Sequence, residues 1–561
     1  MPHLKDHLII CGWNDRVPAL IREITTTNRW VKGRKVVVLS EHTQEKPLEP
    51  FGLIPGSAFF CRGISSDYDK LKEVNLKDAY CAVIVADYHK IQRGNLRGLY
   101  TAVALRKTRP EKEFKIITEL YYEFNEDRFR YAGVTKLIPL ERMSSSVMAH
   151  ACMNPGISDL LVRILSFDAS QVALFVGAAE DKKILLAVKD RTFNKAMKEL
   201  RKQNILLLAV YRVSEKDTGH AETELDFRNP SPYFLNPSAQ EEYRISEKDS
   251  LLIIKSNIAD TSSEQTWSLE LGKNLPKQSK TRIYDATNEH LLIIGRGKEI
   301  RDIVGTVSNF AQSIISISME ENGKPEITVS ERSGARKLIE DEELADFSLE
   351  HLESLVCKHK NIFSKVTRAV ILEVSPVDSG LEQEDVIYQD DAELSYAIVL
   401  LDLYRKLFGR DLHIAAEMRA DVNLHLYHDI GIAQPIPINR LVELILARMV
   451  FHGGLISEFF LKTMSYRPDN RKVRLKKQSV AALSRELGEE LVSKTFDEVL
   501  EIFFKHPVQL LAFVKADGEI VLNPKSNSDA ATTVKLEADD SLFIFVQPNA
   551  FVPKLQLSTE Q

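Results

Sequence analysis

The chain has 561 residues, a length that predicts about four domains. Hydrophobic residues make up 44% of it and charged residues 27%, which is typical of globular proteins and excludes a disordered or collagen-like chain. The net charge of −6 at pH 7 argues against the broad positive field that drives non-specific binding of nucleic acid.

The sequence favours a cytoplasmic protein. No apolar stretch approaches the ~20 residues that a membrane-spanning helix needs, and the run at residues 8–11 is too short for a signal peptide. The five cysteines are scattered and form no C-x-x-C pair, so neither a disulfide framework nor a zinc site is indicated. We expect no nucleic-acid partner.

Residues 1–143 alternate short apolar runs with segments of helical length. The runs that suit strands are residues 8–11, 35–39, 58–61, 81–86, 115–119 and 136–139. Continuous apolar strands separated by helices are typical of a parallel sheet that is covered on both faces. Gly12 follows the first run and a helix is expected near Asp15, as at the start of a doubly wound domain. The fold class is therefore α/β, beginning with a Rossmann-like lobe.

The next segments predict a different architecture. Residues 144–168 are expected to form crossover helices. Residues 169–257 are expected to form a small α+β module, with short strands around one helix at 193–203. Residues 258–287 are rich in Ser, Thr, Lys and Gln, a composition typical of a linker.

The sequence then repeats the whole plan in the same order. His7–Gly12 returns as His290–Gly295, Phe114–Glu119 as Leu412–Glu417, and Ile138–Met143 as Ile436–Leu441. Because these matches stay collinear while their offset drifts slowly, they indicate an internal duplication. We expect a second Rossmann-like lobe at 288–440, crossover helices at 441–467 and a second α+β module at 468–561.

Several short motifs resemble a known family. The opening Ile9-Ile10-Cys11-Gly12-Trp13-Asn14, the segments 59–63 and 82–87, and the closing Ile138-Pro139 resemble the regulator of K+ conductance (RCK, KTN or TrkA-N) domain. The Leu-Leu-Ala, Asn-Pro and Asp-x-Leu pattern of the modules resembles the TrkA-C subdomain. Together they resemble the tandem RCK domains in the cytoplasmic gating ring of ligand-gated potassium channels.

This resemblance implies a function. Four chains with two copies each would build an eight-domain ring at the inner face of the membrane, beneath a pore module, and ligand binding would change the shape of the ring. A free-standing Trk-type peripheral subunit of a separate potassium transporter remains an alternative. A dinucleotide-dependent oxidoreductase would need an acid–base residue facing the nicotinamide, and we find no candidate, so we expect no enzymatic activity.

The first strand-to-helix turn of each lobe is the expected nucleotide site, because a glycine turn lets phosphates approach a helix N-terminus. The candidate residues are Gly12, Asn14, Arg16 and Glu41 in the first lobe, and Gly295, Arg296, Gly297, Lys298 and Glu320 in the second. The acidic residue after the second strand would accept ribose hydroxyls. Trp13 crowds the first turn, so NAD or another adenine nucleotide is expected in the second lobe.

The resemblance also implies a cation site. Asp87 and Glu119 fall near the carboxylates that calcium-gated relatives use, although two make a small ligand set for Ca²⁺, which prefers six to eight oxygens. The acidic segment 382–391 is expected to be a solvated loop. The histidines at positions 413, 425, 428 and 452 are expected to be surface or core residues.

The crossover helices are also the expected contact between copies. Residues 144–165 and 440–460 carry apolar side chains at helical spacing, among them Leu441, Leu444, Ile445 and Met449. An isolated lobe could not bury all of them. We expect them to pair the two copies partly within the chain and to mediate self-association.

Overall fold

A computed structural model describes most of the chain. The described residues are 3–14, 16–25, 33–41, 56–85, 91–111, 113–120, 126–166, 171–176, 182–211, 233–234, 244–256, 289–307, 311–319, 325–331, 336–339, 348–372, 391–418, 423–452, 459, 463, 474–506, 508–525 and 534–546. The chain divides into two compact units. One comprises Met1–Asp168, Glu222–Leu225 and Tyr284–Gly454, and the other comprises Ala169–Ala221, Asp226–Ile283 and Leu455–Gln561.

The first unit contains two lobes, of which the first is built on a six-stranded parallel sheet. Its order is β3-β2-β1-β4-β5-β6, from β1 (Leu8–Cys11), β2 (Val36–Ser40), β3 (Ala58–Arg62), β4 (Cys81–Ile84), β5 (Lys115–Leu120) and β6 (Lys136–Pro139). Its helices are α1 (Val17–Thr25), α2 (Tyr68–Glu73), the short 3-10 helix η2 (Leu76–Asp78), α3 (Ile91–Thr108) and α4 (Glu126–Tyr131). Four of the strands are buried at every position, as near-continuous apolar runs predict. The Rossmann-like prediction is confirmed for this lobe.

The second lobe has a mixed sheet of seven strands. Its order is β14-β13-β12-β11-β15-β16-β17, from β11 (His290–Arg296), β12 (Ser313–Met319), β13 (Pro325–Glu331), β14 (Arg336–Ile339), β15 (Arg368–Ile371), β16 (His413–Met418) and β17 (Gln434–Pro437). Its helices are α9 (Gly297–Val307), α10 (Leu349–Lys358), α11 (Lys360–Phe363), α12 (Asp391–Phe408) and α13 (Leu424–Ile430).

Five strands of this sheet are parallel, as expected, whereas β13 and β14 are antiparallel to their neighbours. We predicted a wholly parallel second sheet, and this prediction is wrong at the edge formed by β13 and β14. The reason is loop length. The connection between β12 and β13, residues 320–324, is too short for a crossover helix, which a parallel connection would require.

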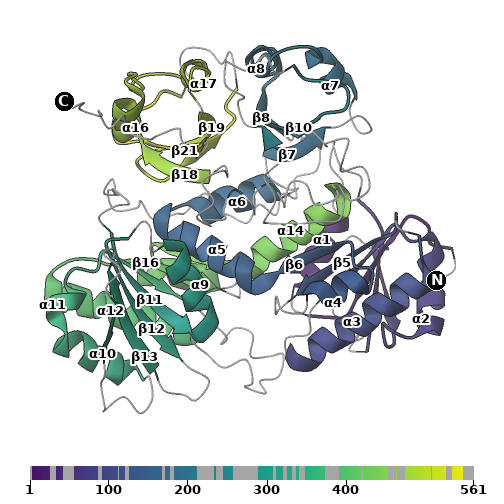
Figure 1. Cartoon of the computed structure of the whole chain (residues 1–561), viewed down its shortest axis with the longest axis horizontal. Helices are drawn as coiled ribbons and strands as arrows, with labels where there is room; N and C mark the ends of the chain where they lie inside the picture. The colour runs from purple at the N-terminus through teal and green to yellow at the C-terminus, as the bar shows by residue number, and fades with distance from the viewer. Residues whose placement is uncertain are drawn as a thin grey trace, which may run out of the picture. The chain divides into compact units, whose positions relative to one another are not determined.

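The crossover helices are exchanged between the lobes. After β6, the chain forms α5 (Leu140–Met153) and α6 (Ile157–Leu165), and α5 packs against α9 and the strands β15, β16 and β17 of the second lobe. After β17, helix α14 (Ile438–His452) packs in return against α1 and β5 of the first lobe and against α6 (Figure 1). Each lobe therefore completes its helical layer with a helix of the other copy.

This exchange corrects one expectation. Leu441, Leu444, Ile445 and Met449 are buried inside the chain, with exposed fractions of at most 3%. The prediction that these side chains mediate association between chains is therefore wrong, because the chain's own first copy covers them.

The second unit contains two antiparallel sheets of four strands. The first module has the order β7-β10-β8-β9, from β7 (Gln171–Val176), β8 (Ile205–Tyr211), β9 (Tyr233–Phe234) and β10 (Ser250–Ser256), with α7 (Lys182–Val188) and α8 (Phe193–Arg201). The second has the order β18-β21-β19-β20, from β18 (Arg474–Ser479), β19 (Val508–Val514), β20 (Ile520–Leu522) and β21 (Ser541–Val546), with α16 (Val480–Leu487) and α17 (Phe496–Phe503). Both modules have an irregularity in register at the same place, because the pairing with the neighbouring strand skips Leu208 in β8 and Leu511 in β19. This match supports the duplication.

Helix α7 corrects the expectation of one helix in the first module. Its apolar run is too short to be assigned to helix or strand from the sequence. In the structure Ile184, Leu185 and Val188 are buried while Leu186 is 54% exposed, which is the spacing of a helix. Among the residues that the structure describes, no helix has both the length and the apolar character needed to span a membrane.

Candidate functional site

The candidate site of the first lobe lies where its parallel strands end. The chain leaves β1 at Gly12, whose φ of +101° favours glycine, and a Cβ placed there would lie 3.1 Å from the Val85 Cγ2 atom. The backbone itself therefore requires this glycine. The carboxyl ends of β2 and β5 bring Glu41 and Glu119 to the same edge of the sheet.

A buried ion pair joins two residues that we had assigned to different ligands. The Nη2 atom of Arg16, directly before α1, lies 2.5 Å from the Oε2 atom of Glu119, and the two side chains are 4% and 0% exposed. The Asn14 side chain donates a 3.5 Å hydrogen bond to the same carboxylate oxygen and accepts one of 3.1 Å from the Arg16 amide. Arg16 is thus bonded to Glu119, which was expected to bind a cation, and the phosphate role expected for Arg16 would require this pair to open.

The pair continues to the second copy of the chain. The Nη1 atom of Arg16 donates a 3.4 Å hydrogen bond to the Oδ1 atom of Asn439, the second residue of α14. The neighbouring Arg440 forms an ion pair with Glu23 of α1, and its other terminal nitrogen lies 3.4 Å from Glu443. The carboxyl end of β5 is therefore linked by side chains to the exchanged helix.

A fully buried arginine secures the same helix farther along. Arg448 donates hydrogen bonds of 2.7, 3.2 and 3.3 Å to the carbonyl oxygens of Leu165, Ile164 and Ser166 at the end of α6. Burial lowers the pKa of Arg448, and the charge of Glu23 acts in the opposite direction. The last carbonyls of a helix lack partners within it, so this cation satisfies groups that would otherwise be buried without donors.

The ribose position of the first lobe also carries an ion pair. Glu41 lies 3.1 Å from the Nη1 atom of Arg97 on α3, and both side chains are exposed, by 38% and 52%. The rings of Trp13 and Phe60 pack with centroids 5.9 Å apart at the same end of the sheet. Both carboxylates of this edge, Glu41 and Glu119, thus have arginine partners.

In the second lobe, packing accounts for one of the predicted glycines. A Cβ on Gly295 would lie 2.7 Å from the Cβ of Leu372, which follows β15, so close packing requires glycine there. Gly297 is the first residue of α9, where a phosphate-binding turn was expected. The side chains of Arg296 and Lys298, and residue Glu320, lie outside the described part of the chain.

The predicted cation site is described only in part. Asp87 and residues 382–390 lie outside the described residues, and so do the side chains of His425, His428 and His452. Within the described residues, no group of three or more His, Cys, Asp or Glu side chains could hold a metal ion. His413 is half-buried at the start of β16.

The residues of α14 that reach the first lobe were not among the predicted site residues. Asn439 and Arg440 stood within a recognised repeat, but the repeat does not show which lobe a crossover helix covers. The signal that could have identified Arg16 and Glu119 as partners was topological. Parallel strands end at one edge, so charges that follow β1 and β5 are brought near each other.

Comparison with known proteins agrees with this architecture. No protein-family model matches the chain. A stretch of 167 residues, 29% of this chain, is 29% identical to the calcium-gated potassium channel TvoK of Thermoplasma volcanium, and the match spans 44% of that channel, less than half of its length. The gating ring of human SLO3 is similar with a TM-score of 0.56 at 13% identity, covering 97% of this chain and 99% of that one. The NAD-bound GsuK channel has a TM-score of 0.42 at 13% identity, covering 98% and 78%.

The likeness to the SLO3 gating ring extends over nearly the whole of both chains. It therefore concerns the complete plan of two lobes and two modules, and it confirms the expected resemblance at the level of the fold. The chain has the fold of the SLO3 gating ring, in agreement with the expected resemblance to tandem RCK domains.

Proposed function

We propose that the chain is the ligand-sensing gating-ring part of a potassium channel, located in the cytoplasm at the inner face of the membrane and acting on a pore module. The observation that carries the proposal is the link from the end of β5 to α14, from Glu119 through Arg16 to Asn439. A ligand that changes the Arg16–Glu119 pair in the first lobe acts directly on a helix that belongs to the second copy. Ligand binding would in this way shift the population between two arrangements of the lobes.

Two ligand classes are proposed, and the first acts directly on this link. A divalent cation held by Asp87 and Glu119 would compete with Arg16 for the charge of the Glu119 carboxylate, so its binding would be coupled to the contact with α14. The name of the relative TvoK, a calcium-gated channel, supports this ligand. An adenine nucleotide such as NAD is proposed for the second lobe, where α9 begins at Gly297 and the N-terminus of a helix favours a phosphate. We propose a binding role without catalysis.

The proposed assembly uses helix α3 of the first lobe. Leu96, Tyr100 and Val103, spaced as one face of a helix, are 49%, 63% and 45% exposed. The corresponding helix α12 has the same length of 18 residues but exposes the charged residues Asp402, Arg405 and Lys406 beside Ile398. Because the crossover helices are covered within the chain, we propose that the α3 face joins neighbouring chains of a tetrameric ring.

The test measures ligand binding and its effect on α14 in the full chain. Calorimetry with Ca²⁺, NAD and ADP identifies the ligand, and hydrogen exchange of the α14 amides reports the response of the helix. Asn439→Ala removes the link while leaving the Arg16–Glu119 pair, so it should preserve binding and abolish the change in α14 exchange. Asn361→Ala, on an exposed residue of α11, is the matched control. If every ligand binds without altering α14 exchange in the wild-type chain, the proposal fails.

A further inference from the structure

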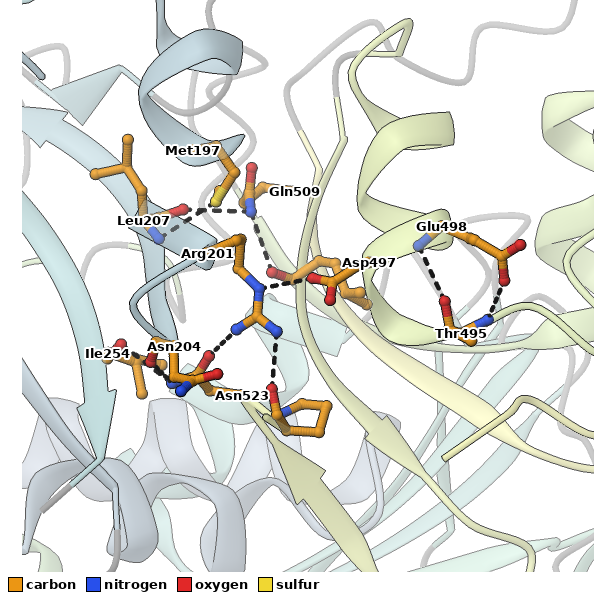
Figure 2. A network of polar contacts seen from close by, with 12 residues as sticks. Met197, Arg201, Asn204, Leu207, Ile254, Thr495, Asp497, Glu498, Gln509 and Asn523 are labelled. Atoms are coloured by element: carbon orange, nitrogen blue, oxygen red, sulfur yellow. Dashed lines mark hydrogen bonds and ion pairs between the residues drawn. The ribbon is translucent and has the colours of Figure 1, made fainter. Parts of the chain in front are cut away.

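The second unit contains an ion-pair network between its two modules. Arg201 is the last residue of α8 in the first module, and its guanidinium contacts residues of the second module (Figure 2). Its Nε atom is 2.7 Å from the Asp497 Oδ1 atom, its Nη2 atom donates a 2.7 Å hydrogen bond to the Pro524 carbonyl, and its Nη1 atom donates to the Asn523 side chain. The Arg201 side chain is 6% exposed.

Asn523 completes the contact in the opposite direction. Its side-chain nitrogen donates hydrogen bonds of 2.9 and 3.3 Å to the carbonyl oxygens of Asn204 and Ile254 in the first module (Figure 2). Gln509 of β19 donates another, of 3.4 Å, to the carbonyl of Leu207 in β8. Each module therefore supplies donors to the other.

A second ion pair shows how the helices are arranged. Lys198 on α8 lies 2.8 Å from Glu501 on α17, and both side chains are more than half exposed. Because Lys198 pairs with Glu501 and Arg201 pairs with Asp497, the two helices run antiparallel.

The two helices are copies of one another that carry opposite charge. Both begin after a threonine, Thr192 and Thr495, that also forms an isolated bridge in its own module. Helix α8 with its C-cap residue carries Lys195, Lys198, Arg201 and Lys202 and one acidic residue, Glu199, whereas α17 carries Asp497, Glu498 and Glu501 and no basic residue. Lys198 of the first copy corresponds to Glu501 of the second.

We propose that these opposite charges determine pairing between modules, so that a first module accepts a second module and rejects another first module. Two α8 helices side by side would bring lysines together and leave Arg201 without a carboxylate, and two α17 helices would bring carboxylates together. Charge complementarity of this kind excludes wrong partners as well as attracting the right one. In the structure the partner of the first module is the second module of the same chain, and the charge pairing depends on no ligand or pore.

The experiment uses two full-length chains with different tags. One carries Lys198→Glu and Arg201→Glu, and the other carries Asp497→Arg and Glu501→Lys. In each chain by itself, the two helices at this contact carry like charge. We therefore expect the amides of α8 and α17 to exchange at least tenfold faster than in the wild-type chain. Mixed together, the two chains have complementary helices, and we expect α8 and α17 to regain protection. Co-purification alone does not report this contact, because chains of the proposed ring would also associate through α3.

A chain with all four substitutions separates charge pairing from misfolding. If pairing depends on the charges, this chain should recover most of the protection that either double variant loses. The proposal is overturned if the four-substitution chain is no better protected than the two double variants. It is also overturned if the double variants exchange as slowly as the wild-type chain, or if mixing the two chains restores no protection of α8 and α17.

Discussion

The Arg16–Glu119 pair can be tested by replacing Arg16 with methionine. Methionine keeps the apolar stem of the side chain but removes the guanidinium. The Glu119 side chain is fully buried and would be left without its cation, and breaking a buried ion pair in this way costs about 3–5 kcal/mol. Most of this cost comes from the stranded charge, so adding Glu119→Gln should return the first lobe to within about 1–2 kcal/mol of the wild-type stability.

The assay is hydrogen exchange of the β5 amides in the full chain, because a chain with several domains does not unfold in one two-state step. Arg130→Met is the matched control. Arg130 lies 2.6 Å from Glu126 within α4, in a pair about 30% exposed, and its loss should cost only about 0.3–0.5 kcal/mol. The reasoning is refuted if Arg16→Met destabilises β5 no more than the control, or if the double variant is less stable than Arg16→Met.

Four further predictions concern ligands, assembly and pH. Asp87→Asn with Glu119→Gln should abolish Ca²⁺ binding in calorimetry, whereas removing the carboxylates of residues 382–391 should not; unchanged binding in the double variant would contradict the site. Gly297→Val should weaken NAD or ADP binding by about 1–3 kcal/mol and Asn14→Val should weaken it less, and the reverse order would place the nucleotide in the first lobe. Tyr100→Asp should lower the mass seen by light scattering more than Ile398→Asp does, and equal effects would argue against the α3 face. Burial lowers the pKa of His7 from 6.5, so the unfolded chain binds more protons and stability should fall as the pH drops below 6.5; a His7→Gln variant with the same acid sensitivity would count against this cause.

The lobes could be predicted from the sequence because their strands are apolar runs of the right length, such as residues 8–11 and 81–84. The edge of the second sheet could not be predicted from such runs. In β13, the polar residues Glu326, Thr328 and Ser330 alternate with Ile327 and Val329, which is the two-residue period of a strand, although Thr328 is buried in the structure. That alternation was the available signal for an antiparallel edge, because β13 contains no continuous apolar run.

The candidate site was predictable in its residues but not in its connections. Arg16 and Glu119 are 103 residues apart, and their contact depends on how the strand ends meet. Asn439 is 423 residues from Arg16, and it reaches the site only because the crossover helices are exchanged. The repeat predicts two equivalent crossover helices. It does not predict whether each helix packs on its own lobe or on the lobe of the other copy. Which of the two packings forms depends on how well the buried apolar and charged side chains of both lobes match each other.

The two halves of the contact between the lobes are related by the repeat but differ in chemistry. On the α14 side, Arg440 and Arg448 are buried with carboxylate and carbonyl partners. On α5, His150 stands where the repeat has Arg448 on α14, and Ser145 stands where it has Glu443. Both side chains are buried.

A buried charge network has few alternative arrangements, because any displacement strands a charge, whereas a contact of small polar and apolar side chains adjusts at lower cost. We therefore expect the half of the contact formed by α14 to adopt one of two discrete arrangements of its buried side chains. The α5 half should follow it, so that a charged ligand at the end of β5 moves both lobes by acting on one of them.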